Sequence, residues 1–472
     1  MNNKKKKNRK DILRRVIPLV LILLMLLTTV LSSIIAMAAD DSYWPTGIEV
    51  NSSSAIVMEA STGTILYEKN MDDTHYPASI TKILTGLIAV ENSDMDAEVT
   101  FSAEAVAESA GGSSSIARDI GEVMTMEQCL YGMMLESANE CAYAIAEYVG
   151  GGDINVFLKM MNDKAKELGC TNSNFCNPNG LPDENHFTSA HDMALIGQAA
   201  LNNETLSQIM ATKSYKIPPT NKHEEETLLN NHHSMLNFYK TSKYLYDGCL
   251  GGKTGYTVDA NNTLVTFAER DGMKLICVVM EVDAPFHYTD TISLFDYCFD
   301  NFKLEDASAN KNIFTNLSTE SVGALAENID LTEASVSGNV VLPKTANLSD
   351  TQISVHPKSD TSDESIVGEV VYTYGSRQVG KGNLIFSSTE QAGYPFHNLS
   401  EEDGGSSVKY YRFNFLLVLE VIGLAALAAV ALFLLYREWT KWSVKIHRRR
   451  EETKRRKPQY KVIKRRKRRR RK

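Results

Sequence analysis

Two long apolar runs, one near each end of this 472-residue chain, most strongly constrain what can fold between them. The first covers residues 16–35; it follows a basic start and leads into Ala36-Met37-Ala38, which is the layout of a secretory signal peptide. The second covers residues 413–436 and is long enough to span a bilayer, although it contains Glu420. We therefore expect the folded parts of the chain to lie between these two runs.

The distribution of charge predicts how the chain is oriented across a membrane. Of 50 Lys/Arg and 58 Asp/Glu residues, the first 15 residues hold 8 and 1, and residues 437–472 hold 20 and 3, so 22 and 54 remain between them. Basic residues stay on the cytoplasmic side, so we expect the tail inside and the acidic middle outside. This topology explains the tail better than nucleic-acid binding, which we do not expect, and attraction to anionic lipids would add to it. An uncleaved anchor is the alternative for the first run.

A serine and a lysine lie where a predicted helix begins. Ser79 and Lys82 are three residues apart, and apolar residues follow to about residue 91, which is typical of a buried helix. Residues i and i+3 share one face of a helix, so the hydroxyl and the amine would point the same way. Free backbone N–H groups at a helix N-terminus would also favour negative charge there. The pair suits a serine nucleophile activated by a lysine base, although a capping serine and a surface lysine give the same short pattern.

Two further motifs follow, in the order found in penicillin-recognising serine enzymes. Ser137-Ala138-Asn139 comes after the apolar residues 129–135, and Lys253-Thr254-Gly255 comes after two glycines and before a strand-like run. Each motif alone also fits an ordinary turn. Together with Ser79 and Lys82 they form the series Ser-x-x-Lys, Ser-x-Asn and Lys-Thr-Gly, which indicates acyl transfer through a serine ester.

With the neighbouring segments included, the chain resembles the low-molecular-mass D-alanyl-D-alanine carboxypeptidases over about residues 48–300, and more faintly over 300–395. The segments that carry the resemblance are 76–84, 112–115, 134–142, 177–181, 189–194 and 253–257. The resemblance implies an α+β architecture, the penicillin-recognising (β-lactamase-like) transpeptidase fold, in which helices flank a mainly antiparallel sheet and an all-helical subdomain is inserted. It also implies that the ligands are peptidoglycan stem peptides and β-lactams.

The pattern of apolar and turn residues predicts the elements of this fold. We expect strands at 55–59, 64–67, 263–269 and 274–282, and helices at 79–91, 126–136, 140–148, 155–168, 190–201 and 288–299. Residues 99–124 and 213–252 read as mostly irregular, and residues 170–188 read as a long loop. Strands at both ends of a helical middle imply one sheet that is built from distant segments.

The same reading divides the chain into seven parts. Alternating residues around 368–374 predict a small all-β domain after the catalytic one, and the Gly/Ser-rich stretch after it predicts a linker to a C-terminal transmembrane helix. The expected parts are a signal peptide (1–38), a linker (39–47), a catalytic domain (48–302), a small β domain (303–397), a linker (398–412), a transmembrane helix (413–436) and a basic cytoplasmic tail (437–472).

The resemblance implies a role for each motif residue. Ser79 would attack the carbonyl of the penultimate D-alanine and release the terminal D-alanine, with Lys82 as the base. An ordinary lysine titrates near 10.4, so burial and a second cation would have to lower the pKa of Lys82. Ser137 would pass a proton to the leaving amine. Asn139 would bind the substrate amide or orient Lys82.

The third motif would bind the substrate. Lys253 would be the second cation, and with Thr254 it would hold the terminal carboxylate of the peptide. Gly255 would leave room for the substrate backbone to pair with a strand edge. The backbone N–H groups of Ser79 and Tyr256 would form the oxyanion hole.

Other polar residues are expected to be structural. Asp192 reads as the N-terminal charge of a helix, and His186 and His191 lie near it without a catalytic role. His232-His233 and Asn261 depart from the family's usual residues, which leaves substrate detail open. The seven cysteines read as buried hydrophobic residues, with Cys170 and Cys176 as the one plausible local pair. No spacing of Cys or His indicates a metal, and we expect no cofactor.

Two other functions share part of this pattern. A β-lactamase usually has Ser-Asp-Asn as its second motif, which does not occur in this sequence, and a deacylating glutamate in a Glu-x-x-Leu-Asn loop, a pattern found here only at residues 226–230. The expected β domain and tail anchor favour a wall enzyme. A membrane receptor that senses β-lactams through slow acylation would need a cytoplasmic signalling domain, and residues 437–472 are too short and too charged to form one.

Overall fold

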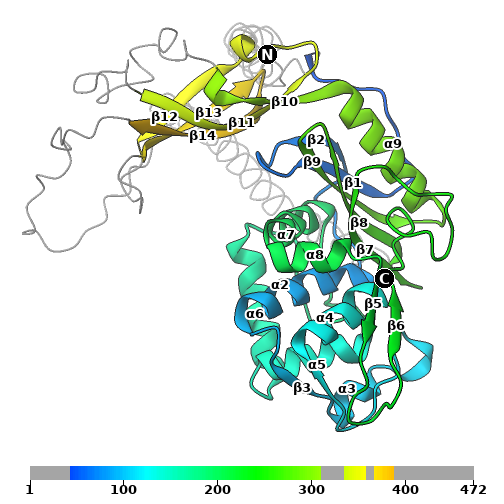
Figure 1. Cartoon of the computed structure of the whole chain (residues 1–472). Coiled ribbons are helices and arrows are strands. Elements are labelled where there is room, and N and C mark those ends of the chain that lie inside the picture. The colour runs from blue at the N-terminus through cyan, green and yellow to red at the C-terminus, as the bar shows by residue number, and fades with distance from the viewer. Residues whose placement is uncertain (1–42, 310–333, 358–365, 387–472) are drawn as a thin grey trace, which may run out of the picture. The chain divides into compact units, whose positions relative to one another are not determined.

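The computed structural model describes residues 43–309, 334–357 and 366–386 (Figure 1). Its first sheet contains five strands in the order β2-β1-β9-β8-β7, and every neighbouring pair is antiparallel. The strands are β1 (Ser54–Glu59), β2 (Ile65–Lys69), β7 (Cys249–Thr257), β8 (Asn261–Arg270) and β9 (Met273–Val282). The expectation of one sheet built from distant segments is therefore confirmed.

Helices cover both faces of this sheet. In the centre of β9, Ile276 lies against Gly197 of α7 (Ala190–Asn202), while the next residue, Cys277, contacts Thr291 of α9 (Phe286–Asn301). Successive side chains of a strand point to opposite faces, so the two helices lie on opposite sides. This explains why residues 275–280 are all buried and apolar rather than alternating.

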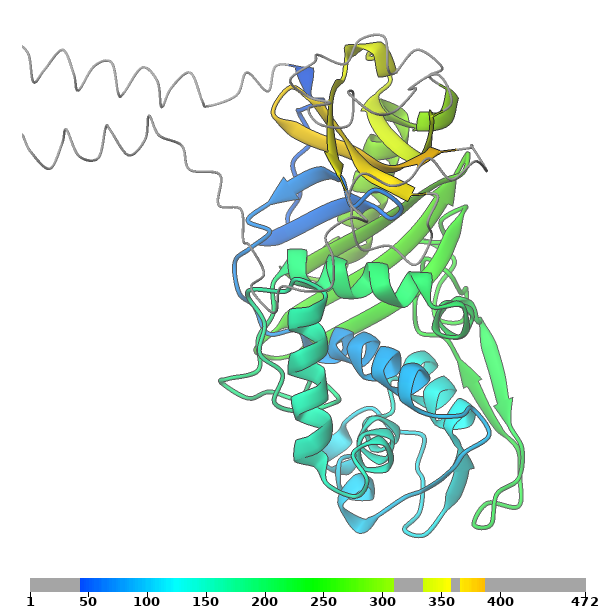
Figure 2. The same ribbon diagram turned by 90° about the vertical axis from the view of Figure 1, so that its left-hand side faces the viewer.

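Other helices surround α2 (Lys82–Asn92), in which every residue from 82 to 89 is buried, and their apolar side chains share one core with a face of the sheet. Figure 2 shows these helices grouped together, away from β1 and β2. An all-round apolar helix can be satisfied only when neighbours surround it, and α2 contacts several other helices. They include α4 (Met126–Leu135), α5 (Asn139–Val149), α6 (Ile154–Glu167) and α8 (Glu204–Ala211).

The two segments expected to be mostly irregular are so, but they contain short regular elements that the sequence did not predict. Residues 99–124 take part in β3 (Glu98–Thr100), which pairs with β4 (Val123–Thr125), and contain α3 (Ala103–Ala107). Residues 213–252 include β5 (Ser214–Ile217) and β6 (Thr227–Asn230), which form a hairpin, and the start of β7. Such short elements carry too little hydrophobic pattern to be recognised without their partners.

A second antiparallel sheet of five strands has the order β10-β11-β14-β13-β12. Its strands are β10 (Phe302–Asp306), β11 (Ala334–Pro343), β12 (Gln352–Pro357), β13 (Ile366–Tyr374) and β14 (Arg377–Phe386). They lie within residues 303–397, apart from Phe302, which begins β10. That these residues form a domain of their own stays a prediction.

Within the described residues, no helix combines the length and the apolar character that crossing a membrane requires. The expected signal peptide (1–38), second linker (398–412), transmembrane helix (413–436) and basic tail (437–472) all lie outside the described residues.

Candidate active site

Ser79 lies in a single 3-10 turn, Ala78–Thr81, and α2 begins only at Lys82. The sequence predicted one helix from Ser79, so the structure corrects the start of that helix by three residues. Ala78 has a positive φ of 51°, which is strained for a residue with a side chain. A Cβ on Gly180 would lie 1.8 Å from the carbonyl oxygen of Ala78, so only glycine allows this close approach. The 177–181 loop therefore packs directly against the turn that carries Ser79.

Lys82 is completely buried, and its amine lies within hydrogen-bond distance of three oxygens. These are Ser79 Oγ at 3.0 Å, Asn139 Oδ1 at 2.7 Å and the carbonyl oxygen of Asn179 at 2.6 Å. The structure thus brings together the first two sequence motifs and the 177–181 loop. No ion pair joins Lys82 to a carboxylate of the described residues.

The two buried lysines both have lowered pKa values. Burial, and then the charge of Lys253, hold the pKa of Lys82 well below its ordinary value. Burial, followed by the charge of Lys240, lowers the pKa of Lys253 to about 7. The Lys253 amine donates to the carbonyl oxygen of Thr254 at 2.8 Å and, like Lys82, has no carboxylate partner among the described residues. Both amines are therefore closer to losing their proton at neutral pH than exposed lysines are.

The second motif forms the turn between α4 and α5. Ser137 has a positive φ of 64°, and its buried Oγ makes no hydrogen bond with any described residue. Asn139 begins α5; its backbone N–H donates to the carbonyl oxygen of Ser114 at 2.9 Å while its side chain accepts from Lys82. The Ser137 hydroxyl is thus buried without a partner among the described residues, two residues from Asn139, which binds the Lys82 amine. A bound substrate can supply the missing hydrogen bond.

The third motif lies inside β7 and not ahead of a strand. Among the described residues β7 is the edge of its sheet, so one side of the strand is open for a peptide to pair with. A Cβ on Gly255 would lie 2.3 Å from Thr263 Oγ1 and 3.0 Å from the backbone nitrogen of Ser79, so the glycine lets β7 approach the serine. Tyr256, whose N–H is an expected oxyanion donor, is 63% exposed.

Asn179 was not among the site residues predicted from the sequence, although its segment carried part of the family resemblance. Its backbone carbonyl accepts from Lys82, and its side-chain amide donates to Glu108 Oε2 at 2.8 Å. The preceding carbonyl, of Pro178, accepts from Thr85 Oγ1 at 2.6 Å. The Asn-Pro-Asn-Gly loop therefore holds the amine of Lys82 through its backbone, a role that side-chain chemistry alone does not reveal.

The polar residues that were expected to be structural form their hydrogen bonds with groups other than Ser79. Asp192 is in the first turn of α7, as expected, and it accepts from Asn172 N–H and Ser173 Oγ at 2.7 and 2.6 Å. Burial lowers the pKa of His186 to about 4. Cys176 N–H donates to His186 Nδ1, so the neutral ring donates from Nε2 to Thr81 Oγ1.

All seven cysteines are free thiols, including Cys170 and Cys176. Burial raises the pKa of the Cys129 thiol beyond the physiological range and that of Cys170 to about 12, so neither is a reactive thiolate. In the part of the chain that the structure describes, no group of His, Cys, Asp and Glu is arranged to hold a metal ion.

The sequence model of the peptidase S11 family, described as D-alanyl-D-alanine carboxypeptidase, matches residues 38–284, which is just over half of the chain. The chain belongs to this family. It is 34% identical over 275 residues to the D-alanyl-D-alanine carboxypeptidase DacF of Bacillus subtilis, covering 57% of this chain and 67% of that protein. It is 32% identical over 250 residues to DacB2 of Mycobacterium tuberculosis, covering 52% and 81%.

Solved structures agree with this membership of the D-alanyl-D-alanine carboxypeptidase family. A mutant of the Streptomyces K15 DD-transpeptidase superposes with a TM-score of 0.50 and 28% identity, over 54% of this chain and all of that one. DacD of Francisella tularensis, at 24% identity, gives a TM-score of 0.53 over 73% of this chain and 94% of its own, which shows likeness of fold. The expected penicillin-recognising fold of sheet and helices is therefore confirmed.

Proposed function

We propose that this chain is a serine-type D-alanyl-D-alanine carboxypeptidase that removes the terminal D-alanine from peptidoglycan stem peptides and is acylated by β-lactams. The observation that carries the proposal is the contact of the Lys82 amine with Ser79 Oγ at 3.0 Å, inside a buried site with a second lysine. A serine hydroxyl needs an adjacent base before it can attack a carbonyl, and a lysine serves only when its pKa is lowered.

The three oxygens around Lys82 suit an amine that has lost its proton. A neutral amine has two N–H groups and one lone pair, and Asn139 Oδ1 and the Asn179 carbonyl can accept both N–H groups. The lone pair then faces the Ser79 hydroxyl, whose proton it takes as Oγ attacks. Asn139 and Asn179 thus orient the base, and Ser79 is the group left to react.

The other motif residues complete the reaction. Lys253 and Thr254 bind the terminal carboxylate, and Gly255 lets the substrate backbone lie along the open edge of β7. The backbone N–H groups of Ser79 and Tyr256 stabilise the oxyanion that forms. As the tetrahedral intermediate collapses, the C–N bond breaks, and the proton held by Lys82 reaches the leaving amine through Ser137. Water then hydrolyses the ester and restores Ser79.

The experiment compares steady turnover with a single acylation. The full-length chain in detergent should release D-alanine continuously from a pentapeptide that ends in D-Ala-D-Ala, and a fluorescent penicillin should label it at one serine. Ser79→Ala should abolish both signals without unfolding the protein. One equivalent of acylation with no turnover would support a sensing receptor instead, and rapid penicillin hydrolysis without peptide cleavage would support a β-lactamase.

We also infer that the catalytic part lies outside the cytoplasmic membrane, anchored by residues 413–436, with residues 437–472 inside. The support is the apolar run and the twenty basic residues that follow it. A chain truncated after residue 409 should be released from the membrane, and protease added to intact protoplasts should spare the tail. If the truncated chain stays bound, residues 16–35 are an uncleaved anchor.

A further inference from the structure

A buried carboxylate lies beside the Ser-x-Asn motif, and the reaction described above does not use it. Glu140 follows Asn139 in the first turn of α5 and is completely buried. Its Oε1 accepts hydrogen bonds from Ser115 Oγ and from the Ile116 backbone N–H, both at 2.7 Å. Its Oε2 is also buried and has no hydrogen-bond partner among the described residues. A buried oxygen without a partner is uncommon and requires a physical reason.

The hydrogen bonds of Glu140 are those of a group that accepts and does not donate. An ionised carboxylate only accepts hydrogen bonds, whereas the acid carries an O–H that must donate. Oε1 already accepts two hydrogen bonds, and around Oε2 no acceptor among the described residues is within reach of such an O–H. The charged form therefore leaves no buried donor unsatisfied. A buried negative charge is costly unless a positive charge compensates it.

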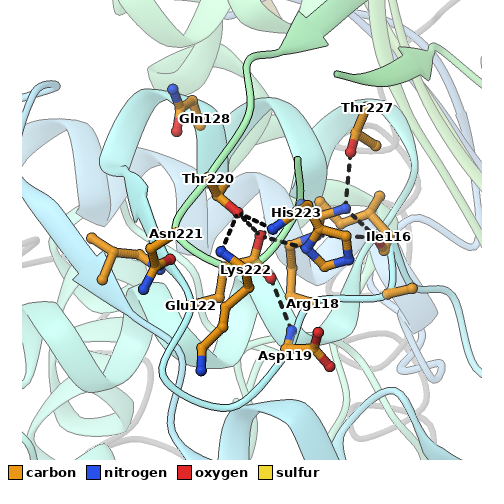
Figure 3. A network of polar contacts seen from close by, with 12 residues as sticks. Ile116, Arg118, Asp119, Glu122, Gln128, Thr220, Asn221, Lys222, His223 and Thr227 are labelled. Atoms are coloured by element: carbon orange, nitrogen blue, oxygen red, sulfur yellow. Dashed lines mark hydrogen bonds and ion pairs between the residues drawn. The ribbon is translucent and has the colours of Figure 1, made fainter. Parts of the chain in front are cut away.

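Glu140 also determines where one wall of the site lies. In the segment 113–117, Ile116 is buried, Ser113 is half-buried and the other residues are exposed. The segment contacts α5 through the two bonds to Glu140 and the bond from Asn139 N–H to the Ser114 carbonyl. The far end of this segment is fixed separately by Arg118 and Glu122, which contact residues 220–227 (Figure 3). Glu140 is thus the side-chain anchor nearest the catalytic groups.

Charged groups act on Lys82 from several elements. Lys253 of β7 acts with burial to lower the pKa of Lys82, and Glu140 is foremost among the groups that raise it. The weaker contributions that also raise it come from Cys141 of α5 and from Glu108, which follows α3. His186, in the 170–188 loop, is neutral at pH 7 because its pKa is about 4. Glu140 itself shares its surroundings with Cys129, Cys141, Arg118 and Glu122.

We propose that Glu140 is a positioning residue for acylation, whose carboxylate holds Ser115 and Ile116 against the Ser-x-Asn motif and supplies the negative charge that opposes Lys253 at the Lys82 amine. This inference rests on the proposed function. Without Glu140, burial and Lys253 act on Lys82 with less opposition, and the amine loses its proton at lower pH. With Glu140 in place, its negative charge opposes Lys253, and the amine loses its proton at higher pH than it would without it.

The test is the pH dependence of acylation, which reports the ionisation of groups in the free enzyme. In the full-length chain, Glu140→Gln keeps an oxygen for Ser115 and Ile116 but removes the charge. Because neutral Lys82 is the base, the acid limb of the second-order rate of penicillin acylation should move to lower pH, since the charge that raises the pKa of Lys82 is gone. The basic limb, which reflects Lys253, should stay in place. Glu127→Gln, on the exposed side of α4, is the matched control for loss of one charge and should leave the profile unchanged.

The outcomes separate this inference from the proposed function. If the unaltered chain is not acylated at Ser79, the proposed function fails. If it is acylated and the Glu140→Gln profile superimposes on it, moves to higher pH or drops equally at every pH, the charge role of Glu140 is wrong. If Glu140→Gln does not fold, Glu140→Asp provides the test, because its shorter side chain keeps the charge but moves the carboxylate away from Ser115 and Ile116. That variant should show a lower plateau with the acid limb in place, and an unchanged plateau would overturn the positioning role.

Discussion

Two regions of this protein bury charged side chains, and they treat the charge in opposite ways. At the active site, Lys82 and Lys253 are buried with no carboxylate partner among the described residues. In the segment before β4, Arg118 and Glu122 are equally buried but form an ion pair at 2.8 Å. The first arrangement leaves cations that lose protons easily. The second leaves charges that stay charged.

The Arg118–Glu122 pair is satisfied on every side (Figure 3). Arg118 donates to the Ile116 carbonyl, to Thr227 Oγ1 and to Glu122, and Glu122 also accepts from Thr220 Oγ1 and Asp119 N–H. Burial would raise the pKa of Glu122, but the bonds from Asp119 and Thr220 and the charge of Arg118 lower it overall. Buried charges that are paired hold two segments of the chain together. Buried amines without a charged partner can change their protonation state, which is what a catalytic base needs.

The largest expected effect is at Lys82. Lys82→Met should lower the rate of penicillin acylation at pH 7 by about 10²–10⁴-fold, because the base is lost. Stability should change by less than about 2 kcal/mol, since two oxygens lose a donor while a buried amine is removed. Stopped-flow labelling and urea denaturation measure the two effects. If Lys82→Met instead lowers the stability strongly while the folded fraction is acylated at the normal rate, Lys82 has a structural role like that of Arg118.

Substitution of Arg118 should have the opposite result, a large loss of stability with little change in acylation. Arg118→Met leaves the Glu122 carboxylate buried without its cation, so the free energy of unfolding should fall by about 3–5 kcal/mol. Acylation per folded molecule should stay within about threefold, because Arg118 touches none of the motif residues. Adding Glu122→Gln should restore part of the stability. If the double variant is no more stable than Arg118→Met alone, the lost stability does not come from an unpaired charge.

The distant strands of the sheet and the three motifs could be predicted from the sequence, because both are recognised from short patterns of neighbouring residues. The start of β7 was missed, because residues up to 252 read as irregular and a strand was expected only after the Lys-Thr-Gly motif. A Cβ on Gly252 would lie 2.0 Å from the Val265 carbonyl oxygen, so this glycine serves close approach of strands and not chain reversal. Only the partner strand reveals that requirement.

Which charged side chains are buried also could not be predicted from the sequence. Nothing in the sequence pointed to Glu140 or Glu122, because burial of a charge depends on partners that are distant along the chain. Glu122 meets Thr220, which is 98 residues away, and the Lys82 amine meets Asn179, which is 97 residues away. No spacing rule connects such residues, whereas Ser79 and Lys82 are joined by a single helical turn.

A smaller effect should appear in how Lys253 binds the substrate carboxylate. A bound carboxylate favours the protonated amine, and the pKa of Lys253 is about 7, so the affinity for a peptide with a free C-terminus should fall as pH rises above 7. The limit is about tenfold per pH unit. Inhibition constants for matched acid and amide peptides from pH 6 to 9 measure this. The amide should show little dependence, and Lys253→Ala should remove the difference; parallel curves for both peptides would exclude the anchor role.

The smallest effect is expected where a third group joins the satisfied pair. His223 Nδ1 lies 3.1 Å from Glu122 Oε1, but its side chain is 32% exposed, and Glu122 keeps Arg118, Thr220 and Asp119 without it. A partly exposed contact of this kind contributes little, so His223→Ala should lower the free energy of unfolding by less than about 1 kcal/mol and leave acylation unchanged. Urea denaturation at pH 7 alongside Arg118→Met measures the contrast. A loss as large as that of Arg118→Met would mean that Glu122 depends on the histidine as much as on the arginine.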